Sequence, residues 1–482
     1  MMAFCRGLIS LLILCFVLFT GAVNTQAADV QEPLTIENRL EALENSTVLN
    51  VIEYGAKGNS VADDTPAIKA AIVAALKIGR ATVYFPAGKY RITETIVIEG
   101  DASKTLALKG DDGGINNTFI TGKMNGDMFD VRMEYNFAVS NISFAHGGTS
   151  GSSLNLAPVS CIISKCGFTN SDKNKSPMLK FYGSNVKIAN CNFDNSCLTA
   201  YAIQCTAITG KLCINNYIID NYIAYLGKGI LVDSQVDGNR PEGLKISRNV
   251  FLNTGEEQIT LKTILHCDIS NNMLDQSALY SILLYPEKLG VTGIYIVDNY
   301  ISPAGGINTP SRREGTTCIQ SVKTGKGGAS IISVSNNMIC YSDYGIVISD
   351  NTNGWNIANN TFNSIEVCGI KMRGAASNII ESNSFLLNTE GLSVDLSSKV
   401  GPNTIVNNQF TKNYVIDLPK DLSIVENNFA GQVIISSTKI EKFGLPVQMI
   451  LFGTLVSLPT VILLTIGFVK YLKKFRKLRV TK

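Results

Sequence analysis

Short segments with alternating apolar and polar residues recur through the middle of the chain. Alternation at every second position is the pattern of a strand with one buried face. In each segment we expect the second and fourth residues to point inward and the third and fifth outward. No amphipathic helical pattern of about 10–15 residues separates the segments, which excludes a doubly wound α/β sheet. The clearest segments are 229–233, 258–262, 281–285, 345–349, 369–373 and 391–395.

A second marker recurs at the same rhythm. An Asn-rich bend is followed by one apolar residue, as in SNNML ending at Leu274 and ANNTF ending at Phe362. The steps between markers are mostly 23 to 28 residues, although the step from Ile301 to Ile339 is 38. This period predicts an all-β, right-handed parallel β-helix in which each coil lies about 4.8 Å above the last. Leucine-rich repeats, the competing solenoid, are excluded because their Leu-x-x-Leu-x-Leu pattern is absent.

Asparagine has a physical role at such a bend. It tolerates the left-handed backbone conformation, and its amide can bond the equivalent amide one coil away. The apolar residue that follows is expected to fill the interior of the coil.

The apolar end of a β-helix needs a cap. Residues 63–77 predict a capping helix, with Asp63 or Asp64 as N-cap and Pro66 in the first turn. Gly79 closes it, and the strand ATVYF and the turn PAGKY follow. Its apolar face is expected to consist of Ala67, Ile68, Ala71, Ile72 and Ala75.

The two ends of the chain predict a location outside the cytosol. The first 28 residues have the pattern of a secretory signal peptide. Residues 446–469 carry no charge in 24 positions and predict a membrane-spanning helix, and the basic tail that follows predicts a cytoplasmic C-terminus. We therefore expect a single-pass type I membrane protein. The expected segments are a signal peptide (1–28), a linker (29–49), the β-helix domain (50–435), a linker (436–445), a transmembrane helix (446–469) and a basic tail (470–482).

Composition narrows the chemistry. The chain of 482 residues has 42 Lys+Arg against 39 Asp+Glu, and the basic tail suits anionic lipids, so no nucleic-acid partner is implied. Only two histidines are present, His146 and His266, and no C-x-x-C pair exists. We therefore predict no metal site. Cys166 and Cys191 occupy equivalent positions one coil apart and predict either a stacked thiol ladder or a disulfide.

The N-terminal motifs resemble a known family. Residues 50–72 and 83–98 are similar to the opening of the pectate-lyase-like (pectin lyase superfamily) right-handed β-helix proteins, in the polygalacturonase, rhamnogalacturonase and epimerase group. The resemblance implies a function among polysaccharide lyases, glycosidases and epimerases. Polygalacturonase activity is not expected, because the Asn-Thr-Asp, Asp-Asp, Gly-His-Gly and Arg-x-Lys motifs of those enzymes are missing from the coils. Uronate lyases often use calcium, but the chain has no acidic loop of calcium-binding spacing, and we predict no resident cofactor.

One outward column carries the candidate chemistry. Elimination or epimerisation of a uronate needs a base and a cation, whereas hydrolysis needs two carboxyl groups. The ordinary interpretation is that exposed Asp, Lys and Tyr form cross-strand pairs without a catalytic role. The candidate catalytic residues are Asp233, Lys262, Tyr285, Glu256 and Glu257. The candidate substrate-binding residues are Tyr182, Asp237, Arg240, Arg312 and Arg313.

Two functions follow from these observations. The first is a membrane-anchored, extracytoplasmic enzyme that acts on cell-surface or secreted polysaccharide as a hydrolase, lyase or epimerase. The second is a non-catalytic surface protein that binds glycan or a partner along the coil. Convergence of Asp233, Lys262 and Tyr285 in one cleft is the observation that favours the enzyme.

Overall fold

The computed structural model describes the β-helix domain in detail. The compact unit that holds it begins at Ser46. The described residues are 46–133, 136–157, 160–194, 199–304, 314–350, 352–386 and 403–411, with the backbone of strands at 392–395, 414–417, 422–425, 428–429 and 433–436.

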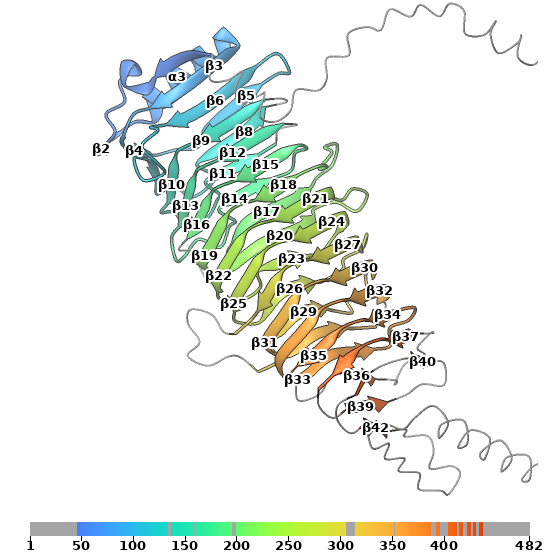
Figure 1. Cartoon of the computed structure of the whole chain (residues 1–482). Coiled ribbons are helices and arrows are strands. Elements are labelled where there is room, and N and C mark those ends of the chain that lie inside the picture. Colours follow the sequence, from blue (N-terminus) through green and yellow to red (C-terminus); the bar gives the residue numbers. More distant parts are fainter. Residues whose placement is uncertain are drawn as a thin grey trace, which may run out of the picture. The chain divides into compact units, whose positions relative to one another are not determined.

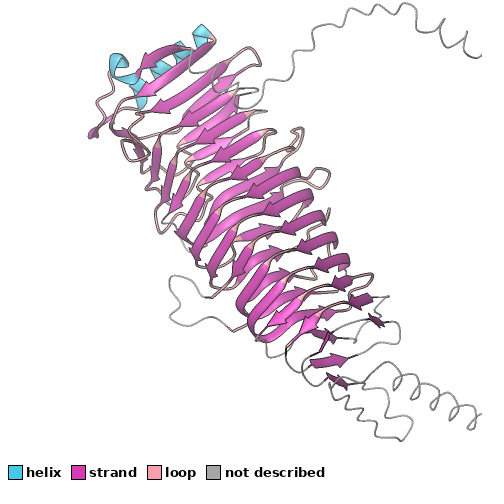
Figure 2. Ribbon diagram, viewed as in Figure 1, coloured by secondary structure: helices cyan, strands magenta, loops and turns pink. Residues whose placement is uncertain are grey.

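Strands of successive coils stack in parallel register, as Figures 1 and 2 show from the capping helix onward. A typical coil contributes one strand to each of three faces. The predicted parallel β-helix is therefore confirmed. The first face is a sheet of β1 (Thr47–Asn50), β3 (Arg80–Phe85), β6 (Thr105–Gly110), β9 (Phe137–Ser140), β12 (Cys161–Ser164), β15 (Val186–Ala189), β18 (Tyr217–Ile219), β21 (Glu242–Ser247), β24 (Ile264–Ser270), β27 (Val291–Val297), β30 (Ala329–Ser335), β32 (Thr352–Ala358), β34 (Ile379–Glu381), β37 (Asn403–Val406) and β40 (Leu422–Val425).

The second face follows the first across a tight bend in most coils. It consists of β2 (Asn59–Asp63), β4 (Gly88–Ile92), β7 (Thr118–Gly122), β10 (Ser143–His146), β13 (Gly167–Asn170), β16 (Asn192–Asp194), β19 (Tyr222–Leu226), β22 (Val250–Thr254), β25 (Met273–Ser277), β28 (Tyr300–Ser302), β31 (Met338–Ile348), β33 (Thr361–Arg373), β35 (Ser384–Leu386), β38 (Gln409–Phe410) and β41 (Asn428–Phe429).

The third face completes each coil and shares the long strands β31 and β33 with the second face. A separate pair, β39 (Tyr414–Asp417) and β42 (Val433–Ser436), follows near the end. The third face consists of β5 (Ile96–Gly100), β8 (Phe129–Met133), β11 (Leu154–Leu156), β14 (Leu179–Phe181), β17 (Tyr201–Ala207), β20 (Lys228–Ser234), β23 (Ile259–Leu261), β26 (Tyr280–Leu284), β29 (Thr317–Ser321), β36 (Leu392–Asp395) and the C-terminal parts of β31 and β33.

A buried asparagine ladder runs along the bend between the first and second faces. At a typical rung, the Asn337 Nδ2 atom donates to Asn360 Oδ1 one coil on (2.9 Å) and to the Ile296 carbonyl one coil back (2.8 Å). Its Oδ1 accepts from the backbone N–H (2.9 Å) and Nδ2 (3.0 Å) of Asn299. The ladder therefore satisfies polar groups that strand pairing leaves buried at the bend. Its members are Asn221, Asn249, Asn272, Asn299, Asn337, Asn360, Asn383 and Asn408.

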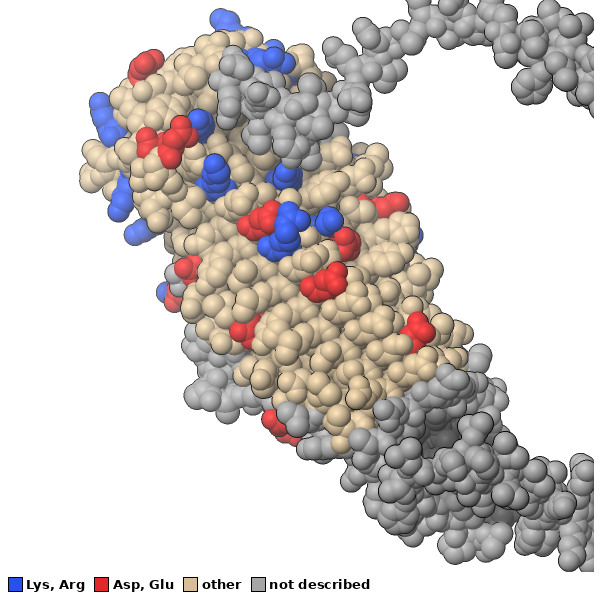
Figure 3. All heavy atoms as spheres, in the orientation of Figure 1, with Lys and Arg blue, Asp and Glu red and all other residues tan. Residues whose placement is uncertain are grey.

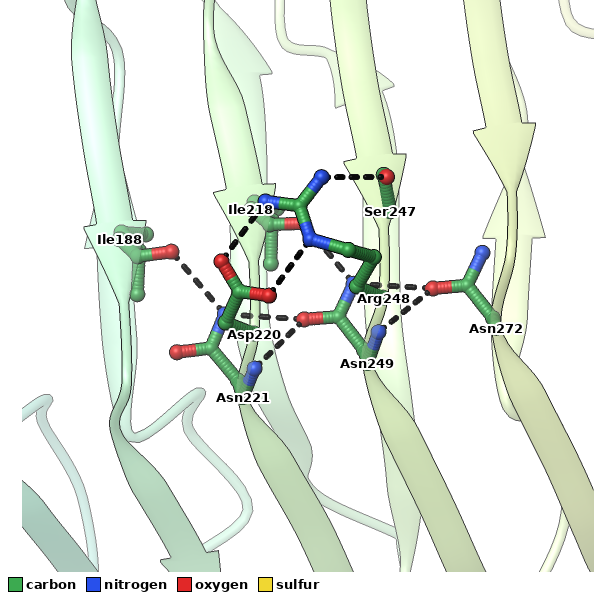
Figure 4. Close-up of polar contacts among 8 residues, drawn as sticks. All are labelled: Ile188, Ile218, Asp220, Asn221, Ser247, Arg248, Asn249 and Asn272. Atoms are coloured by element: carbon green, nitrogen blue, oxygen red, sulfur yellow. Dashed lines mark hydrogen bonds and ion pairs between the residues drawn. The ribbon is translucent and has the colours of Figure 1, made fainter.

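The two tasks that the sequence assigned to one asparagine fall to two adjacent residues. The residue before each ladder asparagine takes the left-handed conformation, as Asn336 does with φ 57°, and the ladder asparagine itself makes the inter-coil bonds. Left-handed residues of adjacent coils can pair on the surface: Arg248 binds Asp220 through two hydrogen bonds of 2.7 and 2.8 Å, as Figure 4 shows above the ladder.

The interior beside the ladder holds stacked apolar side chains. Phe168 and Phe193 stack with ring centroids 4.7 Å apart, as do Phe362 and Phe385. This spacing matches the interval between coils, so neighbouring coils in these two regions each contribute one ring to the core.

The capping helix α3 spans Thr65–Ile78, and its buried residues include all five of the predicted apolar face. The predicted N-cap position and the proline in the first turn are confirmed, but the N-cap side chain does not bond the helix. Asp64 occupies the N-cap position, but its carboxylate accepts from the backbone N–H groups of Lys57 (2.6 Å) and Gly58 (3.2 Å). Asp63 instead accepts from the backbone N–H of Thr65 at 3.1 Å. The Asp-Asp pair therefore ties the preceding turn to the helix rather than capping the helix through one side chain.

Cys166 and Cys191 are free and buried. The Cys166 thiol lies 3.2 Å from the Ser164 carbonyl oxygen and 3.7 Å from the Val139 carbonyl oxygen of the preceding coil. The Cys191 thiol likewise lies 3.4 Å from the Ala189 carbonyl oxygen and 3.7 Å from the Ile163 carbonyl oxygen of the preceding coil. The backbone N–H of Cys191 donates to Asn221 Oδ1, so the cysteine column leads directly into the asparagine ladder. Of the two alternatives, the structure shows the thiol ladder.

The expected signal peptide, transmembrane helix and basic tail lie outside the described residues. Within the part of the chain that the structure describes, no helix is both long and apolar enough to cross a membrane. Strand β1 begins at Thr47, three positions before the expected start of the domain.

The ladder predicts a sharp difference between two neighbouring asparagines. N337A leaves several buried polar groups without partners, so we expect it to lower the free energy of unfolding by at least about 2 kcal/mol. N336G keeps the left-handed turn, which glycine adopts readily, and should stay close to wild type. Chemical denaturation followed by circular dichroism measures both. Equal stability of the two variants would contradict the structural role of the ladder.

Candidate functional site

The predicted column exists on the third face. The register of β20, β23 and β26 pairs Val232 with Leu261 and Leu261 with Leu284, all fully buried. The next residue of each row, Asp233, Lys262 or Tyr285, therefore points outward. These three side chains come from consecutive coils and lie one above the other.

Asp233 and Lys262 each bind a side chain outside the column. The Asp233 carboxylate accepts from Gln204 Nε2 at 3.1 and 2.9 Å. The Lys262 Nζ atom lies 3.3 Å from Glu287 Oε1 and 5.9 Å from the centre of the Tyr285 ring. Sequence reasoning missed Gln204 and Glu287 as partners. Glu287 follows the strand in a turn where strand periodicity no longer applies, so the sequence gives no signal for it.

The loop after β20 forms a wall beside this column. Asp237 pairs with Lys288 at 2.6 Å, and Arg240 Nη1 donates to the Leu289 carbonyl at 3.1 Å. The loop thus reaches two coils along the helix. It borders an open groove of about 420 Å³, whose lining includes Ser234, Asp237, Thr263, Glu287, Lys288 and Lys326. Asp233, Lys262 and Tyr285 lie beside this groove and not in its lining, so the expected convergence of the three in one cleft is not seen.

Glu256 and Glu257 lie at the opposite edge of the third face. Both carboxylates bind Lys228 Nζ, at 2.6 and 3.1 Å, and this ammonium lies 5.3 Å from the Tyr201 ring centre. Lys228 precedes Asp233 by five residues on β20, a distance of about 16 Å. Carboxyl pairs of glycosidases lie about 5–9.5 Å apart. Asp233 therefore does not pair with Glu256 or Glu257 for hydrolysis.

The pKa values of Lys228 and Tyr201 are both raised. Burial lowers the pKa of Lys228, but the hydrogen bond to Glu256 and the charge of Glu257 outweigh it, and the net pKa is raised. Burial raises the pKa of Tyr201, whose hydroxyl lies 3.5 Å from Thr260 Oγ1. At neutral pH Lys228 is a cation and Tyr201 a neutral phenol. Neither group is a base.

Tyr182 lies further along the same face. Its backbone N–H donates to the Leu156 carbonyl, which places it in the outward column of Asp233, two coils earlier. Burial, followed by the charge of Asp130, raises its pKa. Arg132 neutralises Asp130 at 2.6 Å. The remaining candidates, Arg312 and Arg313, lie outside the described residues.

Figure 3 shows one face of the molecule that is mainly uncharged, with a mixed cluster of basic and acidic side chains near its middle and others standing singly. Within the described ranges, no group of three or more His, Cys, Asp or Glu side chains is arranged to hold a metal ion.

Comparisons with known families agree with this architecture. Residues 48–266 match the family described as rhamnogalacturonase A/epimerase, pectate lyase-like. Residues 327–440 match the family described as periplasmic copper-binding protein (NosD). The resemblance to pectate-lyase-like β-helix proteins is thereby confirmed.

Individual relatives match either a short part of the chain at high identity or most of the chain at low identity. Mannuronan C5-epimerase AlgE1 of Azotobacter vinelandii is 52% identical over 48 residues, 10% of this chain and 3% of that protein. Plasmin and fibronectin-binding protein A of Streptococcus pneumoniae is 23% identical over 80% of this chain and 59% of its own length. The solved structure of a mannuronic acid specific polysaccharide family 6 lyase from human gut microbiota is 14% identical, with a TM-score of 0.53, and covers 79% of this chain and 91% of that chain. The last likeness shows the shared fold alone.

Removal of Lys228 should destabilise the fold, because two partly buried carboxylates lose their counterion. We expect K228Q to lose about 1–3 kcal/mol of unfolding free energy, because Glu257 is only 8% exposed and keeps no counterion. K228Q/E257Q should recover part of this loss. K245Q, which removes an exposed pair with Asp268, should cost less than about 1 kcal/mol. Urea denaturation of the four proteins compares them, and equal losses for K228Q and K245Q would contradict the buried cluster.

The protonation state of Tyr201 can be measured directly. Because burial raises its pKa, its phenolate should form only above pH 10, the ordinary value for tyrosine. The ultraviolet difference between wild type and Y201F during an alkaline titration isolates this group. A transition below pH 9 would instead identify Tyr201 as a base.

Proposed function

We propose that the third face binds an acidic polysaccharide and acts on it by proton abstraction, as a lyase or an epimerase. The observation that carries this proposal is the column of Asp233, Lys262 and Tyr285 beside a walled groove. A chain of sugars that lies along the coils meets one of these side chains at each coil, about 4.8 Å apart.

The column contains the groups that uronate chemistry needs. Asp233 is the proposed base that removes the proton alpha to the uronate carboxylate. Lys262 is the proposed cation that stabilises the negative charge developed on that carboxylate. Tyr285, whose side chain is 40% exposed, is the proposed proton donor. Donation to the leaving glycosidic oxygen completes elimination, whereas return of a proton to the opposite face of the sugar carbon completes epimerisation.

The choice of substrate class rests on both structure and relatives. Asp233 lies across the face from Glu256 and Glu257, which disfavours hydrolysis by these carboxylates as a pair. Mannuronan epimerases and an alginate lyase share 52–57% identity with this chain over 44–48 residues. A uronate polymer is therefore the proposed substrate.

A binding function without turnover is the second candidate. The relative that covers 80% of this chain is named for binding plasmin and fibronectin. In addition, Asp233 and Lys262 are each engaged, by Gln204 and Glu287 respectively. A substrate must displace these contacts before the column can act, whereas a binding surface can keep them.

The proposal places the β-helix outside the cytosol, held by the expected helix at 446–469. The signal peptide, the anchor and the absence of a resident cofactor, with calcium as the alternative, remain parts of the proposal. They follow from the sequence patterns described above.

Turnover by the full chain on alginate, polygalacturonate and neutral glucans tests the proposal. Ultraviolet absorbance of unsaturated products reports elimination, solvent deuterium incorporation reports epimerisation, and new reducing ends report hydrolysis. D233N should lower kcat at least about 100-fold with little change in KM, because it removes the base. D268N removes an exposed carboxylate on the first face and should behave as wild type.

The same assay separates the two candidates. Retention on immobilised uronate polymer without turnover, lost in K262Q, would support binding alone. Turnover that survives in D233N would contradict the assigned base.

A further inference from the structure

A cavity of about 700 Å³ opens on the second face, near its N-terminal end. It lies at the ends of β4, β7, β10 and β13, away from the column on the third face. Its lining includes Arg91, Thr121, Lys123, Ala145, Thr169 and Ser171. We call this cavity the N-terminal groove.

The groove follows from an outward column with a small residue at its centre. Arg91, Thr121, Ala145 and Thr169 are paired in register across four coils. The residues before Ala145 and Thr169, Phe144 and Phe168, are buried in the core, so this column points outward. Because Ala145 has only a methyl group, the surface is hollow between the two threonines.

A glycine-rich loop that contains Gly148 and Gly151 borders one side of the groove. A Cβ atom at Gly148 would lie 1.8 Å from the Met124 carbonyl oxygen, and one at Gly151 would lie 2.0 Å from the Gly126 carbonyl oxygen. Glycine therefore lets this loop lie directly against the preceding coil.

His146 builds part of the groove lining and is not available as a base. It is 1% exposed, and its Nδ1 atom accepts from the Gly148 N–H at 3.1 Å. The proton therefore sits on Nε2, which donates to the Gly126 carbonyl at 2.8 Å. Both nitrogens of the neutral ring are satisfied, so His146 positions the loop.

The lining of the groove has positive charge without a carboxylate. Arg91 Nε donates to the Val61 carbonyl at 3.0 Å, which orients the guanidinium, and the charge of Arg91 also interacts with that of Asp63. Lys123 is exposed, and among the described residues neither cation has an ion-pair partner within 4.0 Å. The neighbouring carboxylate of Asp63 is held by the hydroxyls of Thr65 (2.6 Å) and Thr93 (2.8 Å).

We propose that the N-terminal groove is a second, non-catalytic binding site for an acidic oligosaccharide. Arg91 and Lys123 would bind a sugar carboxylate, and the hydroxyls of Thr121, Thr169 and Ser171 would bind sugar hydroxyls. The volume lies within the range of about 300–1,000 Å³ that is usual for small-ligand pockets and exceeds the space that a single inorganic ion fills. Only the choice of a uronate as ligand rests on the proposed function of the third face.

A second site would change how the chain holds a polymer. Two sites on one rigid coil bind a long chain more tightly than either site alone, because the second contact is intramolecular. The groove would thereby keep a long substrate near the third face between successive catalytic events.

Binding of trigalacturonate to the full-length chain tests the proposal by calorimetry. All measurements are made in a D233N/K262Q background, which disables the column on the third face but leaves the groove unchanged. R91Q/K123Q should weaken this binding at least tenfold. A145Y fills the groove while keeping both cations and should weaken it equally. K77Q/K165Q removes two exposed charges elsewhere and should leave it unchanged.

Thermal melts show whether each variant is folded. If R91Q/K123Q is unfolded, the binding of trigalacturonate by A145Y tests the groove instead. Unchanged binding in folded A145Y, or no binding of trigalacturonate in the background protein, would overturn the groove site. The proposed function would survive either result, because turnover by the unmodified chain tests it separately. Equal binding of neutral maltotriose would overturn the assignment to acidic sugars.

Discussion

Parallel pairing between successive coils, about 4.8 Å apart, is the constraint on which the rest of this molecule depends. It satisfies the backbone along the three faces but leaves polar groups buried at each bend. Between Asn221 and Asn408 the asparagine ladder satisfies them, and a typical amide, such as that of Asn337, donates both to the next coil and to the carbonyl of the previous one. Because every rung uses the same geometry, the bend keeps its shape although the lengths of the other loops vary.

The same constraint determines the surface. Residues two dozen positions apart in the sequence become neighbours, so outward side chains form columns along each face. A column suits a polymer because both repeat along one direction. The loop that carries Asp237 and Arg240 converts part of the third face into a groove, while Ala145 and the glycine-rich loop hollow the second face. Local departures from the repeat, in loop length or in side-chain size, thus give the regular β-helix two different sites.

The sequence was sufficient to predict the features that follow a regular pattern of apolar residues. Periodic apolar residues predicted the coils, the buried face of the capping helix and the outward direction of Asp233, Lys262 and Tyr285. Ion partners were harder, because Glu287 lies in a turn and Lys228 precedes the alternating part of its strand. The N-terminal groove could not be predicted, since it depends on how loops of three coils lie against one another.

The same limit applies to the asparagines. A single sequence shows that Asn is frequent at the bends, but not that two adjacent positions divide the left-handed turn and the inter-coil bonds between them. Asn336 and Asn337 are chemically identical and have opposite exposures, which only the coordinates distinguish.

Oxidative cross-linking of D233C/K262C tests the central claim, the vertical stacking of the column, most directly. Neighbours about 4.8 Å apart lie within the Cα separation of about 4.4–6.8 Å that a disulfide spans, so peptide mass spectrometry should find a nearly complete bond. D233C/Y285C, two coils apart, should remain reduced. Failure of the first pair to cross-link, or equal cross-linking of the second, would contradict the account.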